Sequence, residues 1–156
     1  MNGDCNSCLA TSRLVRTFYI YVEIIINTKD VGDISEACVT AKFLKLGFIV
    51  LKPFGDNQRY DLVIDRGFGF ERVQVKTANY KEDYFTFECR SSYAHRGKGT
   101  KDYIGDIELF AVYCHEIDSF YIVPINEAPT ATMTLRLNPP ANGQVKNIKF
   151  ASDFMI

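Results

Sequence analysis

The sequence lacks the basic surplus that most duplex-binding domains carry. Its 18 lysines and arginines are offset by 19 acidic residues, which leaves a net charge of −1 at pH 7. Total charge therefore argues against nucleic-acid binding unless basic residues are gathered locally. Such a local gathering exists in residues 90–101, which contain Arg90, His95, Arg96, Lys98 and Lys101 and no acidic residue.

Disulfide and membrane-spanning patterns are also missing. The five cysteines are odd in number and widely scattered, which predicts a reducing cytoplasmic setting rather than a disulfide framework. The apolar run over residues 18–26 is too short to cross a bilayer, and Glu23 interrupts it. With 47% apolar and 24% charged residues, the 156-residue chain fits one globular domain. We expect this domain over residues 32–156, with residues 1–31 as an N-terminal extension.

Hydrophobic periodicity predicts one helix followed by several strands. Asp33 is a candidate N-cap and Gly47 a candidate helix end, with apolar residues at helical spacing between them. The expected fold class is α/β, an N-terminal helix packed on a mixed (α+β) central sheet. The predicted apolar helix face consists of Ile34, Ala37, Cys38, Ala41 and Leu44. The predicted strands cover residues 48–51, 60–65, 70–77, 84–89, 108–114 and 119–125, with 132–137 and 148–150 as edge strands.

The predicted hairpin over residues 60–77 brings three polar side chains onto one face. Side chains alternate along a strand, so Asp61 faces away from Leu62, and Gln74 and Lys76 face away from Val75. A turn at residues 66–69 pairs position 65 with 70 and position 61 with 74. Asp61 and Gln74 are then cross-strand neighbours with Cβ atoms about 4.5–5.5 Å apart. The alternative is the solvated side of an ordinary amphipathic strand.

This arrangement suits a small, hard cation. Mg²⁺ prefers oxygen ligands, and the hairpin offers the Asp61 carboxylate, the Gln74 amide oxygen and the Val75 backbone carbonyl. A cation held there would polarise a phosphoryl oxygen and lower the pKa of a bound water. Lys76 would orient that water or stabilise charge on the phosphate. Glu36 on the predicted helix would support the metal site; alternatively, it closes a capping box with the N-cap residue.

Basic and polar side chains near the hairpin are candidate phosphate contacts. Arg59 and Arg72 lie close to the three site residues, and a polar loop over residues 91–101 supplies the others. Such groups would contact phosphates rather than bases, whereas the alternative is an ordinary solvated loop. Large aromatics such as Tyr103 are expected in the core. The loop candidates are Ser91, Ser92, Tyr93, His95, Arg96, Lys98 and Lys101.

The sequence around these residues resembles the PD-(D/E)XK endonucleases related to group I intron-encoded homing enzymes. The order of a helical glutamate, an aspartate and an acid-x-lysine motif on a hairpin is also similar to archaeal Holliday junction resolvases and many restriction enzymes. The resemblance covers about residues 32–125. It is carried by residues 32–37 (GDISEA), 46–50 (LGFIV), 53–65 (PFGDNQRYDLVID) and 73–77 (VQVKT), then Tyr103-x-x-Asp106 and residues 110–113 (FAVY).

This resemblance implies a restriction-endonuclease-like core and a Mg²⁺-dependent DNA endonuclease, with Mn²⁺ able to substitute. It implies a core site of Asp61, Gln74 and Lys76, supported by Glu36. The superfamily usually has Asp or Glu at the position of Gln74, but the intron-encoded branch resembles this chain in using Gln. It further implies a homo-oligomer, dimer or tetramer, that acts on both strands of double-stranded DNA without membrane association. Two alternatives to a homing- or restriction-like enzyme are a Holliday junction resolvase-like nuclease and a non-catalytic DNA-binding module of the same fold.

Overall fold

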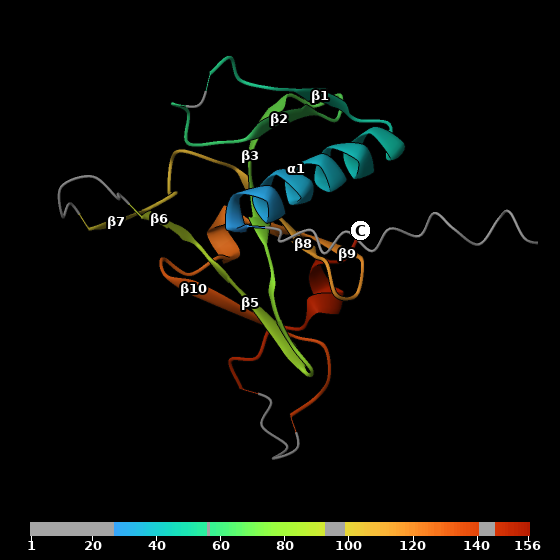
Figure 1. Cartoon of the computed structure of the whole chain (residues 1–156), viewed down its shortest axis with the longest axis vertical. Helices are drawn as coiled ribbons and strands as arrows, with labels where there is room; N and C mark the ends of the chain where they lie inside the picture. Colours follow the sequence, from blue (N-terminus) through green and yellow to red (C-terminus); the bar gives the residue numbers. More distant parts are fainter. Residues whose placement is uncertain (1–26, 56, 93–98, 141–145) are drawn as a thin grey trace, which may run out of the picture.

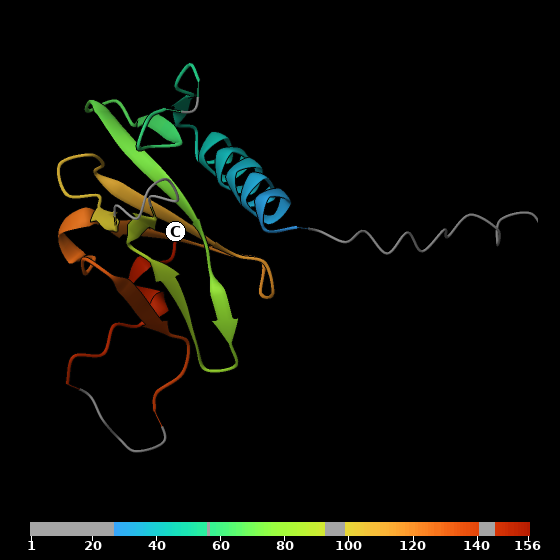
Figure 2. The same ribbon diagram turned by 60° about the vertical axis from the view of Figure 1, so that its left-hand side comes forward.

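The computed structural model describes residues 27–55, 57–92, 99–140 and 146–156. One helix lies along one face of a five-stranded sheet, and a three-stranded sheet packs against the other face (Figure 1). In Figure 2 the long helix is seen by itself on one side of the strands. The helices are α1 (Thr28–Lys45) and the 3₁₀ turns η1 (Ile125–Glu127) and η2 (Ala151–Phe154). The strands are β1 (Ile49–Leu51), β2 (Leu62–Asp65), β3 (Phe70–Thr77), β4 (Asn79–Lys81), β5 (Tyr84–Glu88), β6 (Arg90–Ser92), β7 (Thr100–Asp102), β8 (Leu109–Cys114), β9 (Ser119–Pro124) and β10 (Thr132–Arg136).

The central sheet is mixed, as the sequence predicted. Its strand order is β1-β2-β3-β8-β9, in which β3 and β8 run parallel and the other neighbours run antiparallel. The chain between β3 and β8 supplies β4, β5 and the hairpin β6-β7, and β10, which follows β9, joins β5 and β4 in the three-stranded sheet β10-β5-β4. These smaller sheets were not expected as separate units. Their strands are short, and the sequence pattern shows that a segment is extended without showing which partner it joins.

The start of α1 differs from the prediction. The N-cap is Asn27 rather than Asp33, because the Asn27 side chain accepts hydrogen bonds from the backbone N–H groups of Lys29 and Asp30. The Asp30 carboxylate accepts in return from the Asn27 N–H, which completes a capping box. Residues 28–31, which the sequence placed in the extension, are therefore the first turn of the helix. The predicted end at Gly47 is confirmed, with φ +82° in the left-handed region that glycine adopts without strain.

The buried face of α1 also differs from the prediction. Ser35, Val39 and Phe43 are buried, whereas Ile34 and Leu44 are 41% and 57% exposed. The buried stripe was missed because it begins with a serine. The Ser35 hydroxyl is satisfied inside the protein by the Val31 carbonyl at 2.9 Å, and by two groups from the sheet. Those groups are the Thr77 hydroxyl at 2.7 Å and the His115 imidazole at 2.8 Å.

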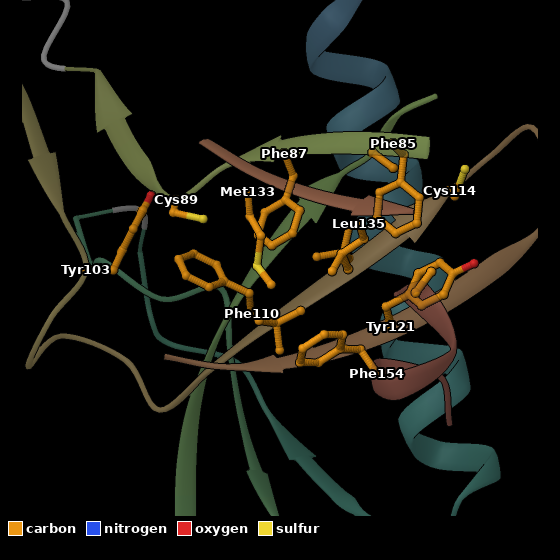
Figure 3. Close-up of a cluster of buried hydrophobic side chains, with 14 of the residues drawn as sticks. Phe85, Phe87, Cys89, Tyr103, Phe110, Cys114, Tyr121, Met133, Leu135 and Phe154 are labelled. Carbon is orange, nitrogen blue, oxygen red and sulfur yellow. The ribbon is translucent and has the colours of Figure 1, made fainter. Parts of the chain in front are cut away.

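Two hydrophobic cores hold the layers together. Between α1 and the sheet, Val39 and Phe43 pack against inward residues such as Leu62, Val73 and Val75. On the other face, aromatic side chains from β5, β8 and β9 meet Met133 and Leu135 of β10 (Figure 3). The expectation that Tyr103 belongs to the core is confirmed, since it is 5% exposed. The strands that carry the candidate site are thus fixed from both sides.

The two predicted edge strands differ from the prediction in part. The segment over residues 132–137 does form a strand, β10, but it pairs with β5 outside the central sheet. The segment 148–150 contributes a single parallel bridge, between Phe150 and Arg136, instead of a strand. The ends of the predicted polar loop are paired as β6 and β7. Among the described residues, no helix is long and apolar enough to cross a membrane.

Candidate active site

The register of the β2–β3 hairpin agrees with the prediction. Asp65 pairs with Phe70 and Leu62 with Val73, so that Asp61 lies beside Gln74 just before β2 begins. The Asp61 N–H donates to the Val73 carbonyl at 2.9 Å, which continues the ladder by one bond. The alternation of buried side chains along the hairpin directs Val73 and Val75 into the core beneath α1. Gln74 and Lys76 consequently face the other way, as expected from the period of two.

The Asp61 carboxylate is hydrogen-bonded to the backbone of β3. Its Oδ2 accepts the Val75 N–H at 2.7 Å and also accepts a hydrogen bond from the Gln74 amide nitrogen. Burial raises the pKa of Asp61, while the Val75 N–H acts against this shift, and the nearby Glu36 carboxylate adds to it. A half-buried carboxylate with a second carboxylate close by is a setting that attracts a cation.

The donor set fits a hard cation, with one adjustment. The Gln74 Nε2 donates a hydrogen bond to the Asp61 carboxylate and lies 3.3 Å from the Val75 carbonyl oxygen. The Asp61 carboxylate, the Gln74 amide and the Val75 carbonyl are therefore close together. Coordination through the Gln74 oxygen requires the amide to turn over, which costs only the two hydrogen bonds it now donates. Among the described residues no three His, Cys, Asp or Glu side chains group as metal ligands. A metal here would therefore depend on the Gln74 amide and the Val75 carbonyl besides carboxylates.

Lys76 is a half-buried ammonium next to this donor set. Its Nζ donates to the Tyr103 hydroxyl at 3.3 Å and lies 4.8 Å from the centroid of the Tyr103 ring. Burial lowers the pKa of Lys76, and the Asp61 carboxylate opposes that shift. A solvated strand face would leave such a lysine in water, which was the alternative interpretation of the alternating pattern. The structure instead places the charge between Asp61 and an aromatic ring.

Glu36 faces Asp61 from α1. It does not cap the helix, because α1 begins eight residues earlier at Thr28, so the capping-box alternative is wrong. Glu36 and Asp61 both line two adjoining cavities of about 300 Å³ each. Glu36 forms an ion pair with Lys52 at 2.5 Å, and Lys52 lines one of these cavities. Lys52 was not predicted from the sequence, since its contact with Glu36 joins two segments that meet only in the folded chain.

The two arginines assigned to phosphates are already engaged. Arg59 forms an ion pair with Asp106 at 2.8 Å and donates to the Asp102 carbonyl. Arg72 forms a bidentate pair with Glu108, with Nη2–Oε1 at 2.6 Å, and hydrogen bonding to Arg72 lowers the pKa of Glu108. A phosphate contact by either arginine would have to compete with these carboxylates.

The remaining phosphate candidates fall within residues 91–101, whose two ends belong to β6 and β7. The Ser91 hydroxyl lies 3.4 Å from the Lys101 carbonyl, and the Lys101 ammonium pairs with Asp106 at 3.0 Å while half exposed. Ser92 ends β6. The other four, Tyr93, His95, Arg96 and Lys98, lie outside the described residues.

Comparison with known proteins decides the family. A family model described as PD-(D/E)XK endonuclease matches residues 26–156. The chain belongs to the PD-(D/E)XK endonuclease family. It is therefore a nuclease, and the helix-on-mixed-sheet architecture is the restriction-endonuclease-like fold. The matched region begins just before Asn27, in agreement with the observed N-cap of α1.

One solved structure supports this assignment in three dimensions. The PD-(D/E)XK chain is similar to the bacterial homing endonuclease I-Ssp6803I, with a TM-score of 0.66 and 26% sequence identity. The similarity covers 83% of this chain and 88% of that one. A comparison with curated proteins finds no significant match. Nucleases of this family typically use divalent metal ions, which agrees with the oxygen donors collected around Asp61.

Proposed function

We propose that this chain is a Mg²⁺-dependent DNA endonuclease of the homing or restriction type. One observation carries the proposal. The Asp61 carboxylate, the Gln74 amide and the Val75 carbonyl converge beside the half-buried Lys76 ammonium, and Glu36 faces them across a shared cavity. The family match and the similarity to a homing endonuclease support DNA as the substrate, and the substrate form proposed is double-stranded DNA.

The protein groups have distinct parts in phosphodiester hydrolysis. When bound, a divalent cation would supply Lewis acidity toward a phosphate oxygen and acidify a coordinated water. Asp61, Gln74 and Val75 would hold it, and Mn²⁺ would substitute because it accepts the same oxygen ligands. Lys76 would place positive charge where negative charge grows on the phosphate or would orient the attacking water. Glu36, held by Lys52, would fix the position of a metal-bound water.

We further propose a homo-oligomer that works in the reducing cytoplasm. Supporting the first point, α1 turns apolar side chains outward: Ile34 is 41% and Leu44 is 57% exposed. Such side chains are available for contact with a second copy of the chain. Supporting the second point, the described cysteines Cys38, Cys89 and Cys114 are all free thiols. The domain that carries the nuclease activity is proposed to be the region matched by the family, with the preceding residues as an extension.

Cleavage of DNA tests the proposal directly. Purified protein is incubated at low salt with supercoiled plasmid, linear duplex and a four-way junction, in Mg²⁺, in Mn²⁺ and in EDTA. We expect nicking or linearisation in either metal and none in EDTA. A rare target sequence is covered by including the DNA that flanks the gene. Preference for the junction would instead identify a resolvase. DNA binding without cleavage of any substrate would identify a non-catalytic binding module and refute the proposal.

Changing Gln74 to glutamate tests its place among the metal ligands. Gln74→Glu adds a second charged oxygen donor beside Asp61, and metal affinity rises with the charge of the ligand set. We expect an active enzyme whose half-maximal activity needs about three- to ten-fold less Mg²⁺. Gln58→Glu is the matched control, because Gln58 lines a cavity with Asp61 but lies off the hairpin. A Gln74→Glu enzyme with an unchanged or higher Mg²⁺ requirement would remove Gln74 from the ligand set.

A further inference from the structure

The Lys76 ammonium rests on a single aromatic ring. Lys76 lies on β3 opposite Val112 of β8, on the side of the sheet away from α1. Its Nζ lies 3.3 Å from the Tyr103 hydroxyl oxygen and 4.8 Å from the centroid of the Tyr103 ring. A half-buried ammonium gains from both contacts, because the hydroxyl accepts a hydrogen bond and the π-face attracts a cation.

The Tyr103 ring is itself held in place. It is 5% exposed and packs edge-on against Phe110, with centroids 5.5 Å apart and planes at 89°. Figure 3 shows Tyr103 at the border of the aromatic core, beside Cys89. Its backbone carbonyl closes the following turn by accepting the N–H of Asp106 at 2.9 Å. The Tyr103 side chain is thus fixed by the core, and its backbone is fixed by the turn. A fixed ring restricts the positions that the Lys76 ammonium can take.

The Tyr103 ring also contacts a second cationic side chain, that of Arg59. The Arg59 guanidinium lies 4.6 Å from the centroid of Tyr103. Arg59 stands two residues before Asp61, and Lys76 two residues after Gln74. Arg59 is tied further to Asp102 and Asp106 on either side of Tyr103. Tyr103 therefore connects both halves of the metal-binding hairpin to the segment that follows β7.

We propose that Tyr103 is a positioning residue of the nuclease, whose ring and hydroxyl hold the Lys76 ammonium in the geometry needed for phosphodiester cleavage. By its contact with Arg59, the same ring also holds the segment that leads into Asp61. This inference rests on the proposed function. Tyr103 does not touch the reacting groups. Its hydroxyl acts through Lys76 and its ring through Lys76 and Arg59, so it alters the cleavage step more than DNA binding.

Three variants test the proposal by single-turnover cleavage. Tyr103→Phe keeps the ring and loses the hydroxyl, and we expect the rate to fall about three- to ten-fold. Tyr103→Leu loses both, and we expect a fall of about 10- to 100-fold. The Kd for DNA and the Tm of the Phe variant should match the wild type. Tyr113→Phe is the control, because it removes a tyrosine hydroxyl from a charged partner, Asp118, away from the site.

A double-mutant cycle separates positioning from mere packing. In a Lys76→Met background, Tyr103→Phe should have no further effect, because the group it positions is gone. An undiminished loss in that background, or wild-type rates in both Tyr103 variants, would overturn the proposal. So would a Kd for DNA that weakens by the same factor as the rate.

A spectroscopic measurement keeps this inference distinct from the proposed function. The Lys76 side-chain protons above the Tyr103 ring should show upfield NMR shifts that vanish in Tyr103→Leu. Wild-type protein that shows the shifts but cleaves nothing would refute the nuclease proposal while leaving the Lys76–Tyr103 contact established. Unshifted Lys76 protons in wild-type protein would overturn the positioning role even if cleavage is observed.

Discussion

Replacing Asp61 with asparagine is expected to lower the rate of Mg²⁺-dependent DNA cleavage by about 10³-fold or more. Asparagine can still accept the Val75 N–H, so the hairpin should keep its register. What disappears is the one charged oxygen ligand that the hairpin supplies. The measurement is single-turnover cleavage of plasmid across a Mg²⁺ titration, because a lost ligand cannot be fully restored by more metal.

Asp65→Asn is the matched control for Asp61→Asn. Asp65 is the last residue of β2, the strand that Asp61 directly precedes, and its carboxylate also accepts a backbone N–H at 2.7 Å, from Gly67. It stands at the far end of β2, away from Gln74 and Lys76. Cleavage by Asp65→Asn should stay within about two-fold of wild type, since exposed substitutions rarely disturb a site. Equal losses in both variants would assign the effect to the hairpin fold rather than to metal binding.

The same substitution makes an opposite prediction for stability without metal. Burial raises the pKa of Asp61, so its ionised form destabilises the folded protein above that pKa. The penalty is fully present above the raised pKa, declines as pH falls through it, and is gone below the ordinary pKa of an aspartate, where both states are protonated. In EDTA, the Tm of Asp61→Asn relative to the wild type should therefore be highest at high pH and should lose this advantage as the pH is lowered. Mg²⁺ should raise the Tm of the wild type only.

Replacing Lys76 with methionine is expected to lower the cleavage rate by about 10²- to 10³-fold. Methionine keeps the length of the aliphatic stem and its packing on Tyr103, while removing the ammonium that faces Asp61. Binding of DNA should change little, because a single half-buried charge adds little to total phosphate attraction. Cleavage under single-turnover conditions and the Kd from a binding titration in Ca²⁺ are the two quantities to compare.

Lys149→Met is the matched control for Lys76→Met. Lys149 also places its ammonium over an aromatic ring, 5.5 Å from the centroid of Phe154, and pairs with Glu127. The substitution therefore removes the same kind of contact remote from the candidate site. It should cleave at the wild-type rate. Full activity in Lys76→Met would exclude Lys76 from the chemistry, and a proportional loss of DNA affinity would make it a phosphate contact instead.

Local sequence patterns were sufficient for the hairpin that carries the site. The positions of Asp61, Gln74 and Lys76 follow from a side-chain period of two and from a four-residue turn, and both are properties of neighbouring residues. The helix start was harder, because Asn27–Asp30 and Asp33–Glu36 carry the same kind of capping signal. Gly32 lies inside α1, where a glycine lowers helix stability by only about 1 kcal/mol relative to alanine.

Neighbouring residues alone were enough to predict that Asp61, Gln74 and Lys76 share one face of a hairpin, and the resemblance of the surrounding sequence was enough to predict the family that the comparison shows. The folded chain was needed to show that Glu36 meets Asp61 across a cavity and that Lys76 contacts Tyr103. It was also needed to show that Arg59 pairs with Asp106 and Arg72 with Glu108. Register depends on adjacent residues and a short turn. Contacts between distant segments depend instead on how the layers pack, which no local pattern encodes.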